Sequence, residues 1–179
     1  MQSTVSQTVI LIGEGIRNMA LLPIAKRLKT QGKKILFFAL YKKTEDIFYI
    51  KKIKKLSNES HILILSPTDN DINDLINKIE RTESPKGSSV LCYVSNEILV
   101  KIKEHRSKLL KKYLFISNIL APMQCMMKGI CGRCIQKVDN KKGYVFACSC
   151  TEYDISKLNL TFNLARLNQN SLLEKVING

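Results

Sequence analysis

Short apolar runs alternate with longer amphipathic stretches over the first two thirds of the chain. The runs have the length and continuous apolar character of strands buried on both faces of a sheet. They predict five strands, at residues 8–12, 34–40, 61–65, 90–94 and 113–116. Apolar positions at helical spacing predict helices within residues 19–28, 46–56, 72–79 and 98–109. Strands that alternate with helices indicate a parallel sheet with right-handed crossovers.

The hydrophobic rhythm changes at residue 117. Residues 134–138 and 144–148 read as two strands of a hairpin, joined by a turn that contains Gly143. A short strand is expected within 156–160, and Asn163 is expected to cap a last helix. The fold class predicted is α/β: a five-stranded parallel Rossmann-like sheet followed by a small cysteine-rich β module. The expected divisions are a nucleotide-binding-like domain at 1–117, an iron–sulfur module at 118–160 and a C-terminal helix at 161–179.

Four cysteines in this second part have the spacing C-x5-C-x2-C-x13-C: Cys125, Cys131, Cys134 and Cys148. Plant-type ferredoxins hold a two-iron cluster with a similar compact loop, C-x4-C-x2-C, and a distant fourth cysteine. Gly129 and Gly132 lie between the thiols, where glycine lets the backbone turn its N–H groups toward a negatively charged centre. The pattern predicts four thiolate ligands to a [2Fe–2S] cluster, with Lys128 and Arg133 stabilising its reduced form.

Two other interpretations of these cysteines remain open. A tetrathiolate zinc site is one, although zinc ribbons usually pair two C-x2-C knuckles and this chain has a single knuckle. A vacant or vestigial site is the other. The fourth ligand also has a rival, because Cys150 follows Cys148 by two residues. Cys148 is preferred because it ends the apolar run that begins at Tyr144.

The first predicted strand runs into Gly13-Glu14-Gly15, with Arg17 two residues further on. Glycines between a strand and a helix let the backbone approach a phosphate, and the helix N-terminus favours an anion. Gly13, Gly15 and Arg17 are therefore candidate contacts for NAD(P). Glu14 places a carboxylate near the expected pyrophosphate, which is unfavourable unless it points away, and Arg17 could compensate. A working nicotinamide site and a structural relic both remain open.

The composition excludes some classes of function but does not by itself indicate one. The net charge is +14, but lysines are spread along the chain and no nucleic-acid motif accompanies them, so a solvated basic surface is expected, able to steer an acidic redox partner. No apolar run is long enough to cross a membrane, and the N-terminus lacks the features of a secretory signal. Six cysteines, four of them in a ligand pattern, favour a reducing compartment, and the cytoplasm is expected.

Isolated reactive side chains offer little more. Cys92 lies inside an apolar run and is expected to be a buried core thiol. His61 opens a predicted strand and His105 lies on a polar helix, so both are expected to be structural or solvated. No catalytic triad and no pair of catalytic carboxylates stands out, and the catalytic set is therefore predicted to be empty.

Two stretches carry a resemblance to a known family. The strand, Gly13-Glu-Gly15-Ile and the following Leu-Leu-Pro-Ile-Ala-Lys26 resemble the nucleotide-binding half of ferredoxin–NADP reductase-like proteins. The segment from Pro122-Met-Gln-Cys125 to Cys134, with Val-Phe-Ala-Cys148, resembles the cluster tail of the dihydroorotate dehydrogenase electron-transfer subunit and of sulfhydrogenase gamma-like subunits. The residue sequence of this segment looks closest to the C-terminal module of larger fused bacterial flavoprotein oxidoreductases. The resemblance covers about residues 8–160.

The resemblance implies an electron-transfer component of an NAD(P)H-dependent oxidoreductase. In the family, a barrel that binds FAD precedes the nucleotide domain, and this chain has no room for one, so FAD is expected only on a partner chain or the sequence is a remnant. Cys92 also lacks the Gly-Pro that the family places after it, near the nicotinamide. The implied role is to relay single electrons between a flavoprotein and an acceptor. The alternatives are a structural zinc module on a degenerate nucleotide-binding domain that acts in protein interaction, and an NAD(P)H-responsive binding domain.

Overall fold

The computed structural model describes residues 8–65, 69–82, 88–105, 113–118, 130, 134–139, 143–149 and 152–161. Its strands are β1 (Thr8–Glu14), β2 (Lys34–Tyr41), β3 (Glu59–Ile64), β4 (Ser89–Tyr93), β5 (Leu114–Asn118), β6 (Ile135–Lys137), β7 (Tyr144–Phe146) and β8 (Glu152–Asp154). Its α-helices are α1 (Asn18–Thr30), α2 (Ile50–Leu56), α3 (Asp69–Arg81) and α4 (Asn96–His105). Short 3-10 turns lie at Gly15–Arg17, Thr44–Asp46 and Ile155–Lys157.

Six strands form the main sheet, in the order β3-β2-β1-β4-β5-β8. The first five pair in parallel, as the apolar runs predicted, and the α/β fold class with a Rossmann-like parallel sheet is confirmed, whereas the cysteine-rich module stays a prediction. β8 is an addition, because it joins the edge of β5 in the antiparallel sense and comes from the part of the chain beyond residue 117. β6 and β7 make the separate antiparallel hairpin predicted there.

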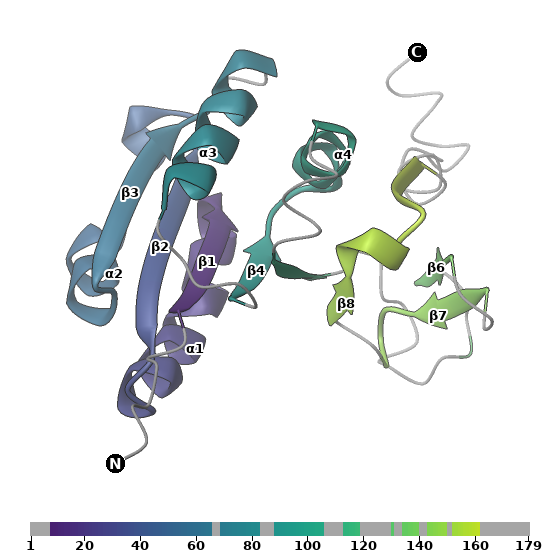
Figure 1. Ribbon diagram of the computed structural model, residues 1–179, viewed down its shortest axis with the longest axis horizontal. Helices are drawn as coiled ribbons and strands as arrows, with labels where there is room; N and C mark the ends of the chain where they lie inside the picture. Colours follow the sequence, from purple (N-terminus) through teal and green to yellow (C-terminus); the bar gives the residue numbers. More distant parts are fainter. Residues whose placement is uncertain are drawn as a thin grey trace.

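Helices cover both faces of the sheet (Figure 1). Alternate residues of the central strands pack against α1 and α2 on one face, where Leu11, Leu21 and Ile53 belong to one buried cluster. The other face packs against α3 and α4. This second cluster continues into the part of the chain after residue 117, called the module below, and includes Val138 and Leu158. The central strands are therefore buried on both sides, which explains why their sequences are continuously apolar.

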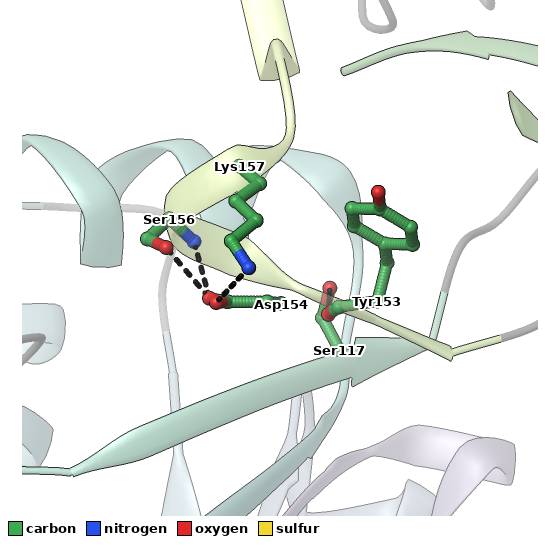
Figure 2. A network of polar contacts seen from close by, with 5 residues as sticks. All are labelled: Ser117, Tyr153, Asp154, Ser156 and Lys157. Atoms are coloured by element: carbon green, nitrogen blue, oxygen red, sulfur yellow. Dashed lines mark hydrogen bonds and ion pairs between the residues drawn. The ribbon is translucent and has the colours of Figure 1, made fainter. Parts of the chain in front are cut away.

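Two predicted elements differ from the structure. The helix expected from Asp46 begins only at Ile50, because Tyr49 has a φ of 58° and a left-handed residue interrupts a right-handed helix. The strand expected within 156–160 is not formed: a 3-10 turn covers Ile155–Lys157, and the strand β8 lies just before it. Asp154 causes the turn, since its side chain accepts the N–H of Ser156 at 3.0 Å and the hydroxyl at 2.7 Å (Figure 2).

Figure 2 also shows how β8 is attached to the sheet. Tyr153 pairs with Ser117 in the strand register, and the Ser117 hydroxyl donates to the Tyr153 carbonyl at 3.5 Å. Lys157 reaches back to Asp154, with 3.7 Å between Nζ and Oδ2. The C-terminal helix expected to be capped at Asn163 lies outside the described residues. None of the helices in the described parts of the chain is long and apolar enough to cross a membrane.

Candidate functional site

The β6–β7 hairpin brings two of the predicted metal ligands together. Cys134 comes directly before β6, whose first residue, Ile135, pairs with Phe146 at the end of β7. The N–H of Ala147 donates to the Cys134 carbonyl at 2.9 Å, and Cys148 is the next residue. Cys134 and Cys148 therefore lie at the same end of the hairpin, one beside each of its two strands, although 13 residues separate them in the sequence.

Both thiols are held in an apolar setting. Cys134 is 1% exposed and Cys148 is 6% exposed, and neither forms a disulfide. They belong to the cluster that includes Val138 and Ala147. Two shielded sulfur donors at one end of a hairpin suit a soft metal centre, whether iron–sulfur or zinc, so the described residues fit the predicted group.

The other half of the predicted ligand set lies outside the described residues: Cys125, Cys131, the glycines at 129 and 132, and the rival ligand Cys150. Within the residues that are described, no three or more His, Cys, Asp or Glu side chains gather as a metal site would require. The structure thus describes two of the four predicted ligands, and the metal site itself stays a prediction.

The glycine loop after β1 has structural reasons for its glycines. A Cβ built on Gly13 would lie 3.1 Å from the Cα of Asn18 and 2.9 Å from Cδ1 of Leu21, so glycine lets α1 pack closely on the strand. Gly15 has a φ of 53°, which L side chains rarely adopt, and a Cβ there would meet nothing within 4 Å. Close helix packing and a left-handed turn account for these two residues without a ligand.

Glu14 links the glycine loop to the segment before α4, a role that the sequence did not predict. Its side chain is 8% exposed and turns across the end of the sheet, where Oε2 accepts the N–H of Ser95 at 2.6 Å. Nη1 of Arg17 lies 3.3 Å from the same oxygen. Arg17, predicted to reach a phosphate, therefore pairs with Glu14 in the same loop. No local sequence signal marks the contact with Ser95, which is 81 residues away.

Tyr41 lies at the neighbouring strand end, where β2 finishes. Its hydroxyl donates to the Phe48 carbonyl at 2.8 Å. Burial raises the pKa of Tyr41, whereas the bond to Phe48 and the approach of the Asn18 amide, which stops short of a full hydrogen bond, act in the opposite direction. The neutral hydroxyl therefore fixes the segment before α2 through its hydrogen bond to Phe48.

The two lone candidates of the sequence are structural. Cys92 is fully buried in β4, and burial raises the pKa of its thiol, so the reactive thiolate is disfavoured. His61 stacks on Phe38, with 4.9 Å between ring centroids, and its Nε2 lies 2.7 Å from Oε1 of Glu59. The burial expected for Cys92 is confirmed. The structural or solvated role expected for His61 stays a prediction, and the side chain of His105 lies outside the described residues.

Comparison with known proteins supports the fold and leaves the function to proposal. No protein-family model matches the chain. A curated relative, the uncharacterized protein RP006 of Rickettsia prowazekii (strain Madrid E), is 51% identical over 63 residues. The match takes in 35% of this chain and 9% of the relative, so the chain spans only a small part of that protein.

Among solved structures, the chain is similar to an NADH-dependent reduced ferredoxin-NADP oxidoreductase, which was solved for insight into flavin-based electron bifurcation. The TM-score is 0.73 at 20% identity, over 94% of this chain and 60% of that one. The C-terminal domain of a Pyrococcus furiosus hydrogenase matches with a TM-score of 0.42 at 16% identity, over 55% of this chain and 85% of that one, too low to carry an argument. The first match establishes a fold like that of a ferredoxin–NADP reductase.

Proposed function

We propose that the chain is an electron-transfer protein in which Cys125, Cys131, Cys134 and Cys148 hold a [2Fe–2S] cluster beside a reductase-type nucleotide-binding fold. It relays single electrons between a flavoprotein partner and an acceptor. The observation that carries the proposal is the meeting of Cys134 and Cys148 at one end of the β6–β7 hairpin. The fold shared with an NADH-dependent reduced ferredoxin-NADP oxidoreductase supports it.

The chain's own residues have three tasks in this function. The hairpin fixes the separation of Cys134 and Cys148, and the apolar cluster around them keeps water from the sulfurs. β8 ties this module to the sheet through the Ser117–Tyr153 pair. When bound, a [2Fe–2S] cluster accepts and donates electrons one at a time. Because a flavin normally stands between a hydride donor and such a carrier, FAD is placed on the partner chain.

Further parts of the hypothesis remain predictions. They are a cytoplasmic location and module boundaries after residues 117 and 160. Of the two alternatives open at Gly13, Gly15 and Arg17, a working NAD(P)H site and a structural relic, the pairing of Arg17 with Glu14 favours the relic. The family branch, that of the dihydroorotate dehydrogenase electron-transfer subunit, and the likeness to the C-terminal module of fused bacterial flavoprotein oxidoreductases are also predictions. Each is separate from the cluster, which can be tested without them.

The direct test is to purify the chain anaerobically and measure iron, acid-labile sulfide and zinc per chain. We expect about two irons and two sulfides, visible absorbance, and an EPR signal after reduction with dithionite. Zinc without sulfide, together with no visible absorbance and no EPR signal, would replace the electron carrier with a structural tetrathiolate module. A chain that binds neither metal under these conditions would also contradict the proposal.

A further inference from the structure

The strand order of the sheet reverses between β1 and β4. The chain proceeds from β1 outward to β2 and β3, then crosses to β4 and continues to β5 on the other side. In open α/β sheets, ligands bind in the crevice at such a reversal, outside the carboxyl ends of the strands. Glu14 ends β1, and Ser95 lies between β4 and α4, so these two residues face each other across that crevice.

The carboxylate of Glu14 occupies this crevice. The Ser95 carbonyl accepts the N–H of Leu99 at 3.1 Å, which makes Ser95 the N-cap of α4. Its own N–H points instead to Oε2 of Glu14, at 2.6 Å. A negative charge at a helix N-terminus is stabilised by the exposed N–H groups and the helix dipole, and bound phosphates use the same position.

We propose that Glu14 fills from within the chain the anion position that a nucleotide phosphate would take, so that this crevice excludes dinucleotides. Arg17 is the cation that could have compensated a pyrophosphate, and it pairs with Glu14. The inference deepens the proposed function and rests on it in one respect: the electrons then arrive from a partner protein and not from nicotinamide bound to this chain.

The charges around the crevice support the exclusion. A hollow of about 270 Å³ beside it is lined by the carboxylates of Glu14 and Glu97 and by one ammonium, that of Lys42. A second hollow that also borders Glu14 is lined by the carboxylates of Glu14, Glu45 and Asp46 and by the two cations Arg17 and Lys42. A pyrophosphate would therefore enter a region where carboxylates outnumber cations. One of these carboxylates, that of Glu14, is buried and already accepts a hydrogen bond.

The test is calorimetric titration of the full chain, purified with its metal, with NADH, NADPH and inorganic pyrophosphate. We expect no saturable binding of any of the three up to about 1 mM. Glu14→Ala removes the carboxylate and releases both the Ser95 N–H and Arg17. This variant should bind pyrophosphate, or one of the nucleotides, at least about tenfold more tightly than the native chain.

The matched control is Glu45→Ala, which removes an exposed carboxylate from the second hollow without touching Ser95. It should gain far less affinity than Glu14→Ala, because solvent screens an exposed charge. Glu14→Gln serves if Glu14→Ala fails to fold, because the amide oxygen can still accept the Ser95 N–H while the charge is lost. It should show a smaller gain in affinity. Circular dichroism checks the fold of each variant.

Two results would overturn the inference. One is saturable binding of NADH or NADPH by the native chain with a Kd below about 100 μM. The other is the absence of any gain in folded variants at position 14, which would mean that the carboxylate is not what excludes the nucleotide. Iron and sulfide content, measured on the same samples, tests the proposed function separately, since neither nucleotide result depends on it.

Discussion

The hydroxyl of Tyr93 donates a hydrogen bond to the carboxylate of Glu152, which joins the end of β4 to the start of β8 across 59 residues of sequence. Burial raises the pKa of Tyr93, and the hydrogen bond and the negative charge of Glu152 raise it further. Because β8 pairs with β5 and not with β4, this contact is a second link between the sheet and the module.

The Tyr93–Glu152 contact predicts a loss of stability at alkaline pH. The pKa of Tyr93 is higher in the folded chain than in the unfolded chain, so above about pH 10 the unfolded state loses its proton first and stability falls as pH rises. Tyr93→Phe should flatten this fall and cost about 1 kcal/mol at pH 8 through the lost hydrogen bond. Urea unfolding at pH 8, 9.5 and 10.5 measures both effects. Tyr49→Phe, at an exposed tyrosine before α2, should reproduce neither.

Substitution of the hairpin cysteines tests the ligand set. Cys134→Ser and Cys148→Ser should each reduce the iron per chain by more than half and remove the visible absorbance, because a thiolate ligand is lost. Cys150→Ser should keep the metal if Cys148 is the fourth ligand, and the reverse result would assign that role to Cys150. Cys92→Ala is the control, expected to keep the iron while costing about 1 kcal/mol of stability.

The glycines after β1 should differ in their tolerance of alanine. Gly13→Ala forces a methyl group against the backbone of Asn18 and the side chain of Leu21, which predicts a cost of about 2–3 kcal/mol. Gly15→Ala strains only the backbone and should cost about 1 kcal/mol, close to the value for Gly32→Ala, where φ is 70°. Thermal unfolding of the three variants gives the order. A Gly13→Ala variant as stable as the other two would contradict the close packing of α1 on β1.

Leu158 tests whether the sheet and the module unfold together. It is 1% exposed within the cluster that contains the α3 and α4 face of the sheet, and Nζ of Lys103 donates to its carbonyl at 2.6 Å. Leu158→Ala should cost about 2–4 kcal/mol and shift a single unfolding transition. Leu114→Ala, at a side chain that is 49% exposed, should cost well under 1 kcal/mol. Two separate transitions would show instead that residues after 117 form an independent domain.

The parallel sheet could be predicted because its strands are buried on both faces. Residues 35–40 form an unbroken apolar run, and all six are fully buried between the two helical layers. β8 could not be predicted, since Glu-Tyr-Asp has no strand pattern of its own and pairs only because β5 offers an edge. The left-handed backbone at Tyr49 could not be predicted either, because such a conformation at a tyrosine is set by the packing around it.

The candidate site shows the same division between local and distant information. The hairpin that joins Cys134 to Cys148 follows from two short apolar runs and a glycine turn, all close together in sequence. The contact between Glu14 and Ser95 depends on the meeting of β1 and β4, which are separated in sequence by three crossovers. Local pattern therefore predicted the hairpin that brings Cys134 and Cys148 to one end, but it could not show that Arg17 would turn toward Glu14.

The antiparallel pairing of β8 also protects the chain from self-association. Three residues of β8 cover Ile116, Ser117 and Asn118, whose N–H and C=O groups would otherwise be open to a strand from another molecule. Detachment of β8 would expose the unpaired edge of β5 on an apolar sheet. A chain in which β8 does not pair with β5 would consequently be prone to aggregation, and quality-control proteases would be expected to degrade it.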